Sequence, residues 1–144
     1  EYHLTIRQNV QPTPGQPDKE PFYIPIKIAF WGQSGKKLNF HYQGQISNEI
    51  VLVLNQASKN FKFSNFSEKP VLSFLRDFSA PVIVNRAIQP QEWISLMKFD
   101  DNLFIRWESG QSLFIHEFKR CFNVEFDNNS QSMEISLEFL SALK

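Results

Sequence analysis

The hydrophobic periodicity of this chain changes once, near residue 88, and this change constrains the fold more than any other feature of the sequence. Up to about residue 87, apolar and polar side chains alternate in the two-residue rhythm of strands with one buried face. From residue 88 onward, apolar side chains recur every three or four residues, as on the buried side of an α-helix. The sequence therefore predicts a β domain over residues 1–87 and the first helices of a helical domain over residues 88–144.

Seven candidate strands follow one another in the first part without an intervening helix. They span residues 2–8, 23–31, 37–42, 49–55, 60–66, 71–78 and 81–86. Short strands at this spacing are typical of an antiparallel, immunoglobulin-like β-sandwich. Residues 49–55 are apolar on both faces, which predicts a central strand. Pro25 predicts an edge position where the second strand starts, and Gly32 and Gly35 supply the conformational freedom for the turn that follows it.

The connection between the first two strands, residues 8–21, contains four prolines. Proline fixes its own φ and disfavours helix at the preceding residue, so this segment is expected to be stiff and extended. Two interpretations remain open: a PxxP ligand for a partner domain, or an ordered excursion between two strands. The excursion is favoured.

The helical part predicts three helices. Pro90 suits the first position of a helix that continues over residues 91–99. Its apolar stripe consists of Trp93, Leu96 and Met97. Asp100 or Asp101 can cap a second helix over residues 102–122. A third helical pattern covers residues 130–144, with an apolar stripe of Met133, Leu137 and Leu140.

The second helix is apolar around much of its circumference. Its main stripe is Leu103, Trp107, Gly110, Phe114, Phe118 and Cys121, and further apolar residues off that stripe are Phe104, Ile105, Leu113, Ile115 and Phe122. A helix of this kind needs neighbours on several sides. Because an interior glycine costs about 1 kcal/mol relative to alanine, Gly110 predicts a close helix crossing.

One short segment invites comparison with a zinc-protease motif. In HExxH, two histidines four residues apart bind zinc and the glutamate activates water. His116 and Glu117 start such a pattern, but Arg120 occupies the position of the second histidine, and a guanidinium has no lone pair to give. His3 and His41 lie far upstream in candidate strands. We therefore assign no metal, catalytic or substrate-binding residue to this chain and expect His116 on the more polar face of its helix.

Charge and cysteine content exclude further classes of site. The chain has 15 basic and 15 acidic side chains, without the basic excess that nucleic-acid binding usually leaves. No apolar run is long enough to span a membrane, and the start shows no signal-peptide pattern. The single cysteine, Cys121, excludes an internal disulfide and fits a reducing, cytoplasmic compartment. It is expected to pack within its helix rather than act as a catalytic thiol.

Two independent binding functions stay open as alternatives. Trp31 is predicted on the outer face of its strand, where it could stack against a carbohydrate, whereas Trp93 and Trp107 are expected in the core stripe. A less favoured alternative is single-stranded nucleic-acid binding through "NFKFSNF", residues 60–66, with Lys59 and Lys62 beside the aromatic rings.

Both ends of the chain predict that it is part of a longer polypeptide. It begins at Glu1, directly on a strand-like alternation, and stops at Lys144 within a helical pattern that has no glycine or proline exit signal.

Several short segments of the sequence resemble the M1 family of zinc aminopeptidases, of the aminopeptidase N type. The strongest match is "FKFSNFSEKPVLSFLRDFSAPVIV", residues 61–84, which resembles a segment near the end of that family's small sandwich domain. Upstream, "LTIRQNVQPTPGQPDKEPFYIPIKI" is similar to the family's entry strand, proline loop and second strand. Downstream, one helix of the family carries an arginine-tryptophan pair followed by glutamine-serine-leucine. The corresponding residues in this sequence are Arg106, Trp107, Gln111, Ser112 and Leu113.

The resemblance implies a modular enzyme in which this chain is the sandwich plus the opening helices of the helical domain. Zinc, the HExxH motif and the GxMxN substrate-amine loop would belong to a catalytic domain, and they have no counterpart here. The resemblance implies a non-catalytic part that packs against the catalytic and helical domains of an enzyme removing N-terminal residues from peptides. No cofactor is expected in residues 1–144.

Overall fold

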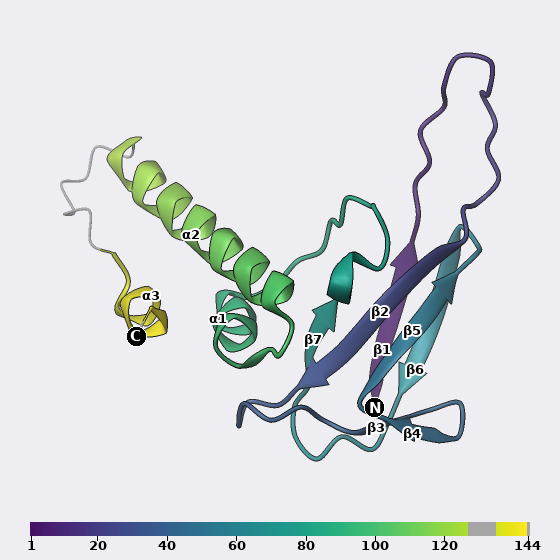
Figure 1. Ribbon diagram of the computed structural model, residues 1–144. Helices are drawn as coiled ribbons and strands as arrows, with labels where there is room; N and C mark the ends of the chain where they lie inside the picture. The colour runs from purple at the N-terminus through teal and green to yellow at the C-terminus, as the bar shows by residue number, and fades with distance from the viewer. Residues whose placement is uncertain (127–134, 144) are drawn as a thin grey trace.

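The computed structural model describes residues 1–126 and 135–143 as an antiparallel β-sandwich followed by three helices (Figure 1). The strands are β1 (Tyr2–Arg7), β2 (Ile24–Trp31), β3 (Phe40–Tyr42), β4 (Gln45–Ser47), β5 (Glu49–Leu54), β6 (Ser58–Phe63) and β7 (Val71–Phe74). They are followed by a single 3₁₀ turn, η1 (Arg76–Phe78), and by α1 (Pro90–Phe99), α2 (Leu103–Phe126) and α3 (Leu137–Ala142). The predicted fold class, a seven-stranded immunoglobulin-like sandwich with three helices, is confirmed.

The sandwich core consists of aromatic and aliphatic side chains between two layers. One layer contains the β1–β6 pair, and the other has the strand order β5–β2–β7. Phe30, Phe40 and Phe63 are completely buried between them. Their rings meet edge to face with centroids 5.1–5.5 Å apart, the arrangement that aromatic quadrupoles favour. The alternation seen in the sequence therefore does mark the buried faces of these strands.

The position of two strands differs from the prediction. Strand β5, expected at the centre, lies at the edge of its sheet, and β2 is the central strand. The side chain of Val51, which points outward from β5, is half exposed. An apolar residue on each face of a strand was therefore not a sign that the strand pairs on both edges. Pro25 was interpreted correctly, because β7 pairs with β2 only from Ile28 onward. Pro25 therefore needs no donor on that side.

The predicted strand over residues 81–86 is wrong. After β7 the backbone enters the left-handed region at Leu75, Asp77 and Phe78, with φ of 59°, 55° and 51°, which ends the extended chain. Residues 79–89 then run to α1 without regular structure. The seventh strand is instead β4, which the sequence reasoning missed. A tight turn at Gln43 and Gly44, both with positive φ, joins it to β3.

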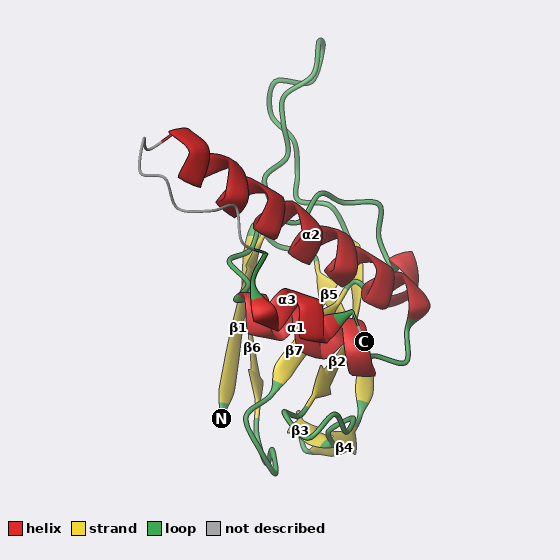
Figure 2. Ribbon diagram, turned by 90° about the vertical axis from the view of Figure 1, so that its left-hand side faces the viewer, coloured by secondary structure: helices red, strands yellow, loops and turns green. Residues whose placement is uncertain are grey.

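The helices cover the outer face of the three-stranded sheet, beside β7 and β2 (Figures 1 and 2). Trp31 and Val71, which point outward from these strands, pack against Leu96 of α1 and Ile105 of α2. The predicted start of α1 at Pro90 is confirmed. The cap of α2 is not Asp100 or Asp101: the side-chain oxygen of Asn102 accepts a hydrogen bond from the Ile105 amide at 3.2 Å.

The buried face of α2 differs from its predicted main stripe. Over residues 103–121 of this helix, the buried side chains are Ile105, Ser109, Leu113 and Glu117, whereas Leu103, Trp107, Phe114 and Phe118 of the predicted stripe are exposed. Packing selected the face that meets α1 from a helix that is apolar nearly all round. The close crossing expected at Gly110 is present, because a Cβ there would lie 3.3 Å from the Met97 sulfur.

The last helix packs through one aromatic side chain. Phe139 of α3 is buried against Leu113, while Leu137 and Leu140 of the predicted stripe are exposed. Met133, the third member of that stripe, lies outside the described residues. Within the described part of the chain, no helix is both long and apolar enough to cross a membrane.

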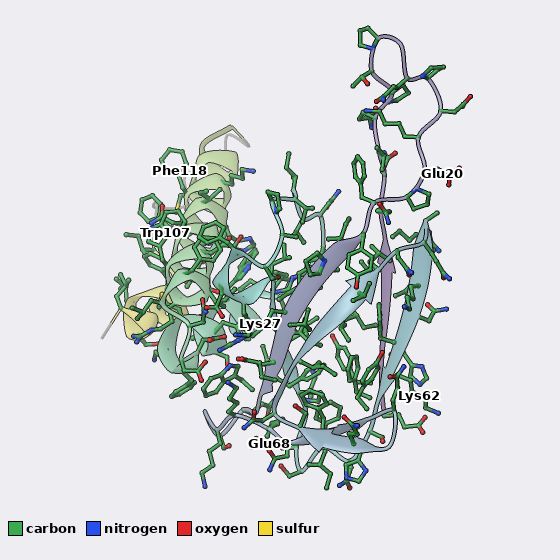
Figure 3. The ribbon with its side chains drawn as sticks, turned by 45° about the vertical axis from the view of Figure 1, so that its right-hand side comes forward. Glu20, Lys27, Lys62, Glu68, Trp107 and Phe118 are labelled. Atoms are coloured by element: carbon green, nitrogen blue, oxygen red, sulfur yellow. The ribbon has the colours of Figure 1, made fainter. Side chains whose placement is uncertain are left out.

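The proline-rich segment projects beyond the sandwich as a long excursion between β1 and β2, and Glu20 lies on the arm that returns to β2 (Figures 1 and 3). Gln8 ties its base together. The side-chain amide of Gln8 donates to the carbonyls of Phe22 and Gln56, both at 3.0 Å, and its oxygen accepts from the Phe22 amide at 2.8 Å. These hydrogen bonds hold the two ends of the excursion side by side.

Candidate functional site

A cluster of charged side chains lies where the sandwich meets the corner between α1 and α2. We call it the Arg76 cluster, and its members are Lys27, Lys37, Glu49, Arg76, Asp77, Asp100 and Asp101. They come from two strands, a turn, η1 and the α1–α2 connection, so the cluster forms only when the sandwich and the helices are in contact. Lys27 lies between the sheet and the helices (Figure 3).

Arg76 is the centre of this cluster and is only 3% exposed. Its Nε donates to Glu49 at 2.9 Å, and its Nη1 donates to Asp100 at 2.7 Å and to the Ser73 hydroxyl at 2.9 Å. Its Nη2 donates to Asp101. All three guanidinium nitrogens are therefore used, in the fork-like geometry that distinguishes arginine from lysine.

Two lysines complete the pairing around Arg76. Lys27 contacts Glu49 at 2.9 Å and Asp77 at 2.6 Å. Lys37 contacts Glu49 at 3.2 Å and Asp101 at 3.0 Å. Positive and negative groups thus alternate through the cluster, so each buried or half-buried charge has a partner of opposite sign.

The pairing stabilises the charged form of every member whose pKa is shifted. Burial alone would raise the pKa of Glu49, but hydrogen bonds from Lys27 and Lys37 outweigh it and hold that pKa below the ordinary value. The pKa of Asp101 is lowered in the same way, because Lys37 and Arg76 outweigh its desolvation. Carboxylates held ionised like this are poor proton donors and acceptors near neutral pH. The arrangement is suited to joining two structural units rather than to acid–base chemistry.

The corner between α1 and α2 is built into the same cluster. The Asp100 side chain is fully buried, and besides Arg76 it accepts a hydrogen bond from the Asn102 amide at 2.8 Å. Asn102 in turn caps α2 through the Ile105 amide. The direction in which α2 leaves the sandwich is therefore linked, through Asp100, to Arg76.

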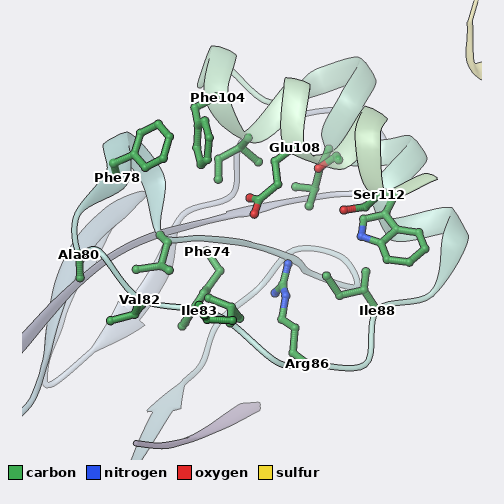
Figure 4. Close-up of a pocket in the computed structure, with 16 residues that line it drawn as sticks. Phe74, Phe78, Ala80, Val82, Ile83, Arg86, Ile88, Phe104, Glu108 and Ser112 are labelled. Carbon is green, nitrogen blue, oxygen red and sulfur yellow. The ribbon is translucent and has the colours of Figure 1, made fainter. Parts of the chain in front are cut away.

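A cavity of about 410 Å³ lies between the sandwich and the helices (Figure 4). Its walls are the chain from Phe74 to Ile88 on one side and α1 and α2 on the other. Most of the lining is apolar, and the charged side chains among it are Arg86 and Glu108.

The outer surface of α2 carries an exposed apolar stripe. Its members are Leu103, Trp107, Phe114 and Phe118, with exposed fractions between 57% and 77%. Contiguous exposed apolar side chains of this size mark surfaces that contact another protein part.

The residues of the incomplete HExxH pattern have structural roles. His116 packs against the Trp93 ring with centroids 5.7 Å apart, so it is not simply solvated. Glu117 accepts hydrogen bonds from Arg120 at 3.1 Å and from the Ser136 hydroxyl at 3.0 Å. Ser136 caps α3 through the Phe139 amide. Glu117 therefore fixes the start of α3 against α2.

The three histidines lie on separate elements. His3 is on β1, next to Glu1, and His41 is on β3, within 3.2 Å of the Asn65 amide. Across residues 1–126 and 135–143, no group of three His, Cys, Asp or Glu side chains is placed to hold a metal ion. The donor sets in this part of the chain thus do not fit a zinc site.

The tryptophan predictions are corrected by the structure. Trp31 does point outward from β2, but α1 and α2 cover it and leave only 6% of it exposed. Its ring cannot stack against a carbohydrate. Trp107, expected in the core, is 61% exposed, whereas Trp93 is half-buried beside Leu113 and Phe139 as expected.

Two of the three aromatic side chains in the segment proposed for nucleic-acid binding, residues 60–66, are also buried, and the third, Phe66, is half-buried against the sandwich core. Phe61 and Phe63 belong to the sandwich core, with 2% and 0% of their surface exposed, so their rings cannot stack on bases. Cys121 is half-buried on α2.

Sequence reasoning missed the Arg76 cluster. Asp100 and Asp101 were interpreted only as helix caps, and Lys27 and Arg76 were assigned no role. The available signal was a lysine on an otherwise apolar outer face, together with an Arg-Asp pair where a strand ends. Neither signal reveals that residues 50 or more positions apart meet.

Comparisons with known proteins agree on one family. Residues 1–87 match the family model described as "Domain of unknown function (DUF3458) Ig-like fold". Aminopeptidase N of Haemophilus influenzae is 35% identical over 142 residues, covering 99% of this chain and 16% of that protein. Aminopeptidase N of Escherichia coli is 33% identical over 144 residues, again covering 16% of the relative. The chain thus spans about a sixth of the length of these relatives.

A solved structure shows the same arrangement of elements. The crystal structure of Legionella pneumophila aminopeptidase A in complex with aspartic acid superposes with a TM-score of 0.71 at 27% sequence identity. The similarity covers 99% of this chain and 14% of that one. The match includes the helices as well as the sandwich, so the contact between them is part of what the two proteins share.

Proposed function

Because this chain belongs to the family described as a domain of unknown function (DUF3458) with an Ig-like fold, within the M1 aminopeptidases, we propose that it acts as a structural connector. Residues 1–87 are the sandwich domain, and residues 88–144 are the first helices of a larger helical domain. The connector joins that helical domain to a catalytic domain and sets their relative position. The complete polypeptide removes N-terminal amino acids from peptides, with zinc held in the catalytic domain.

The Arg76 cluster is the observation that carries this proposal. It ties three carboxylates from the sandwich and from the α1–α2 corner to one buried guanidinium, which holds the helices in one orientation. In an enzyme whose helical domain covers the active site, that orientation determines how a peptide N-terminus reaches the reacting water. The cluster does this without taking part in the chemistry.

The exposed stripe of α2 supports the same role. Leu103, Trp107, Phe114 and Phe118 face away from α1 and the sandwich. The rest of the helical domain would bury this stripe in the complete polypeptide. The half-buried Cys121, as a single cysteine, fits a reducing compartment, and we place the protein in the cytoplasm.

Zinc content and arylamide hydrolysis test where the chemistry lies. Residues 1–144 alone should bind no stoichiometric zinc and release no arylamine from an amino-acid arylamide, whereas the complete polypeptide should do both. Turnover together with stoichiometric zinc in residues 1–144 alone would refute the proposal.

A substitution in the complete polypeptide tests the positioning role. Arg76→Leu should lower kcat/KM for arylamides about 10-fold or more, since small displacements far from the chemistry are costly, while the zinc content stays unchanged. Arg7→Leu, at an exposed position on β1, is the matched control and should leave both quantities unchanged. Full activity of Arg76→Leu would argue against positioning through this cluster.

A further inference from the structure

The cavity between residues 74–88 and the helices has the size and lining of a small-molecule site. Its volume, about 410 Å³, falls within the range of ligand pockets, which are mostly apolar with a few polar groups. Phe74 and Phe104 contribute apolar walls, and Ser112 contributes a hydroxyl. Two charged side chains, Arg86 and Glu108, decide which kind of ligand fits.

Arg86 reaches into this cavity without a carboxylate partner. It is half-buried, its guanidinium lies over the Phe74 ring at 5.7 Å, and both terminal nitrogens donate to one carbonyl, that of Leu72, at 3.3 Å. It forms no ion pair with any carboxylate in residues 1–126 or 135–143. Burial lowers the pKa of Arg86, which shows that its charge is poorly solvated. A half-buried cation without an ion-pair partner favours an anionic ligand.

Glu108 of α2 lies on the opposite wall. The charged ends of Arg86 and Glu108 point toward each other across the cavity without forming an ion pair (Figure 4). The space between them therefore has a positive and a negative side. A simple carboxylate would be repelled by Glu108, and a simple amine would be repelled by Arg86.

We propose that this cavity binds a free α-amino acid with an apolar side chain. The ligand carboxylate pairs with Arg86, the ammonium group pairs with Glu108, and the side chain lies against Phe74 and Phe104. This ligand matches both charges and the apolar lining at once. The site is independent of the connector role, because it lies to one side of the Arg76 cluster and uses none of its residues.

Titrations followed by NMR test the ligand class. L-leucine, 4-methylpentanoate and 3-methylbutylamine share an apolar tail and differ only in which charged groups they carry. We expect L-leucine to cause saturable amide shifts in residues 83–88 and 104–112, and each single-charge analogue to bind at least 10-fold more weakly. Absence of saturable shifts with L-leucine, or equal binding of either analogue, would overturn the proposal.

Matched variants test the two charged residues. Arg86→Gln and Glu108→Gln should each weaken L-leucine binding at least 10-fold. Arg7→Gln and Glu20→Gln remove the same charges from exposed positions elsewhere and should leave binding unchanged. If Arg86→Gln fails to fold because the Leu72 contact is lost, Glu108→Gln decides, since Glu108 is an exposed helix residue. Unaltered binding in Glu108→Gln would contradict the assignment.

Discussion

At the residue scale, Arg76 is paired so fully that its removal leaves charges without partners. Asp100 has no exposed side-chain surface, and Arg76 itself is 3% exposed. Replacing a well-paired buried arginine by an apolar side chain leaves its carboxylate partners without an opposite charge. The left-handed residue before it, Leu75, turns the chain so that the guanidinium points to the α1–α2 corner.

We therefore predict that Arg76→Leu lowers the free energy of unfolding by about 3–5 kcal/mol, the usual cost of breaking a buried ion pair from one side. Urea unfolding followed by circular dichroism measures this. Arg7→Leu is the control and should change the free energy by less than about 0.5 kcal/mol, as is usual for surface substitutions. A loss in Arg76→Leu no larger than in the control would mean that the cluster contributes nothing to stability.

The depressed pKa values of Glu49 and Asp101 predict how stability depends on pH. Each carboxyl binds a proton less readily in the folded chain than in the unfolded one, so its contribution is complete above its ordinary pKa, about 4.5 for Glu49. The contribution is lost as pH falls through the lower, folded pKa. Stability should therefore decrease as pH is lowered below about 4.5.

Glu49→Gln tests this pH dependence because its side chain cannot ionise. The variant should be less stable than the wild type near pH 7 and should lose less stability between neutral and acid pH. Urea midpoints measured across that range compare the two curves. Glu20→Gln, on the exposed proline-rich excursion, is the control. Parallel curves for wild type and Glu49→Gln would show that Glu49 does not carry the effect.

At the element scale, the turn between β2 and β3 contacts the end of α1. Gly35 in this turn has a φ of +78°, and a Cβ there would lie 2.7 Å from the Phe99 ring. The turn therefore needs glycine both for its backbone conformation and for the approach of the helix. This contact gives the sandwich a second attachment to α1, beside the Arg76 cluster, because Phe99 directly precedes Asp100.

Alanine substitutions at Gly15 and Gly35, which have nearly the same φ, distinguish the cost of the backbone conformation from the cost of the contact with the helix. Gly15 has a φ of +80°, and a Cβ added to it would have nothing within 4 Å, so Gly15→Ala should cost only the left-handed conformation, about 1–2 kcal/mol. Gly35→Ala should cost about 1–3 kcal/mol more, the typical penalty for overpacking. Thermal unfolding compares the two variants. Equal losses, or no recovery when Phe99→Ala is added to Gly35→Ala, would exclude the ring contact as the cause.

Element types were predictable from periodicity, but their neighbours were not. Alternation identified β1, β2 and β6 because each buries one face, and Pro90 marked the start of α1. Residues 81–86 are also rich in β-branched side chains, yet the left-handed backbone at Leu75, Asp77 and Phe78 removes them from the sheet. No local pattern shows in advance that non-glycine residues will adopt such a conformation, because tertiary contacts stabilise it.

The candidate site was less predictable than the fold. Periodicity offered several apolar faces of α2, and the buried one was selected by α1 and by Trp31, which lie far away in the sequence. The Arg76 cluster likewise joins Lys27, Glu49 and Asp100, which no spacing rule connects. Sequence reasoning identified the family and the fold class, whereas contacts over long sequence distances determined how the sandwich and the helices meet.

At the scale of the whole molecule, the sandwich and the helices share one cooperative contact. Trp31 and Val71 become exposed to solvent if the helices detach from the sheet. Asp100 loses its ion pair with Arg76 if η1 unfolds. Each part thus depends on the other for buried groups that would otherwise be exposed or left unpaired. Such mutual dependence favours unfolding in a single step.

Two spectroscopic signals separate the parts and test this cooperativity. All three tyrosines, Tyr2, Tyr23 and Tyr42, belong to the sandwich part, whereas far-ultraviolet helical circular dichroism reports mainly on α1 and α2. In the wild type, the tyrosine absorbance and helical signals should follow one urea transition. In Arg76→Leu the helical signal should be lost first, because the helices retain less buried area than the sandwich core once the ion pairs are broken. Separate transitions in the wild type would show that the two parts fold independently, and the Arg76 cluster would then be an ion network on a loose contact rather than the joint between two domains.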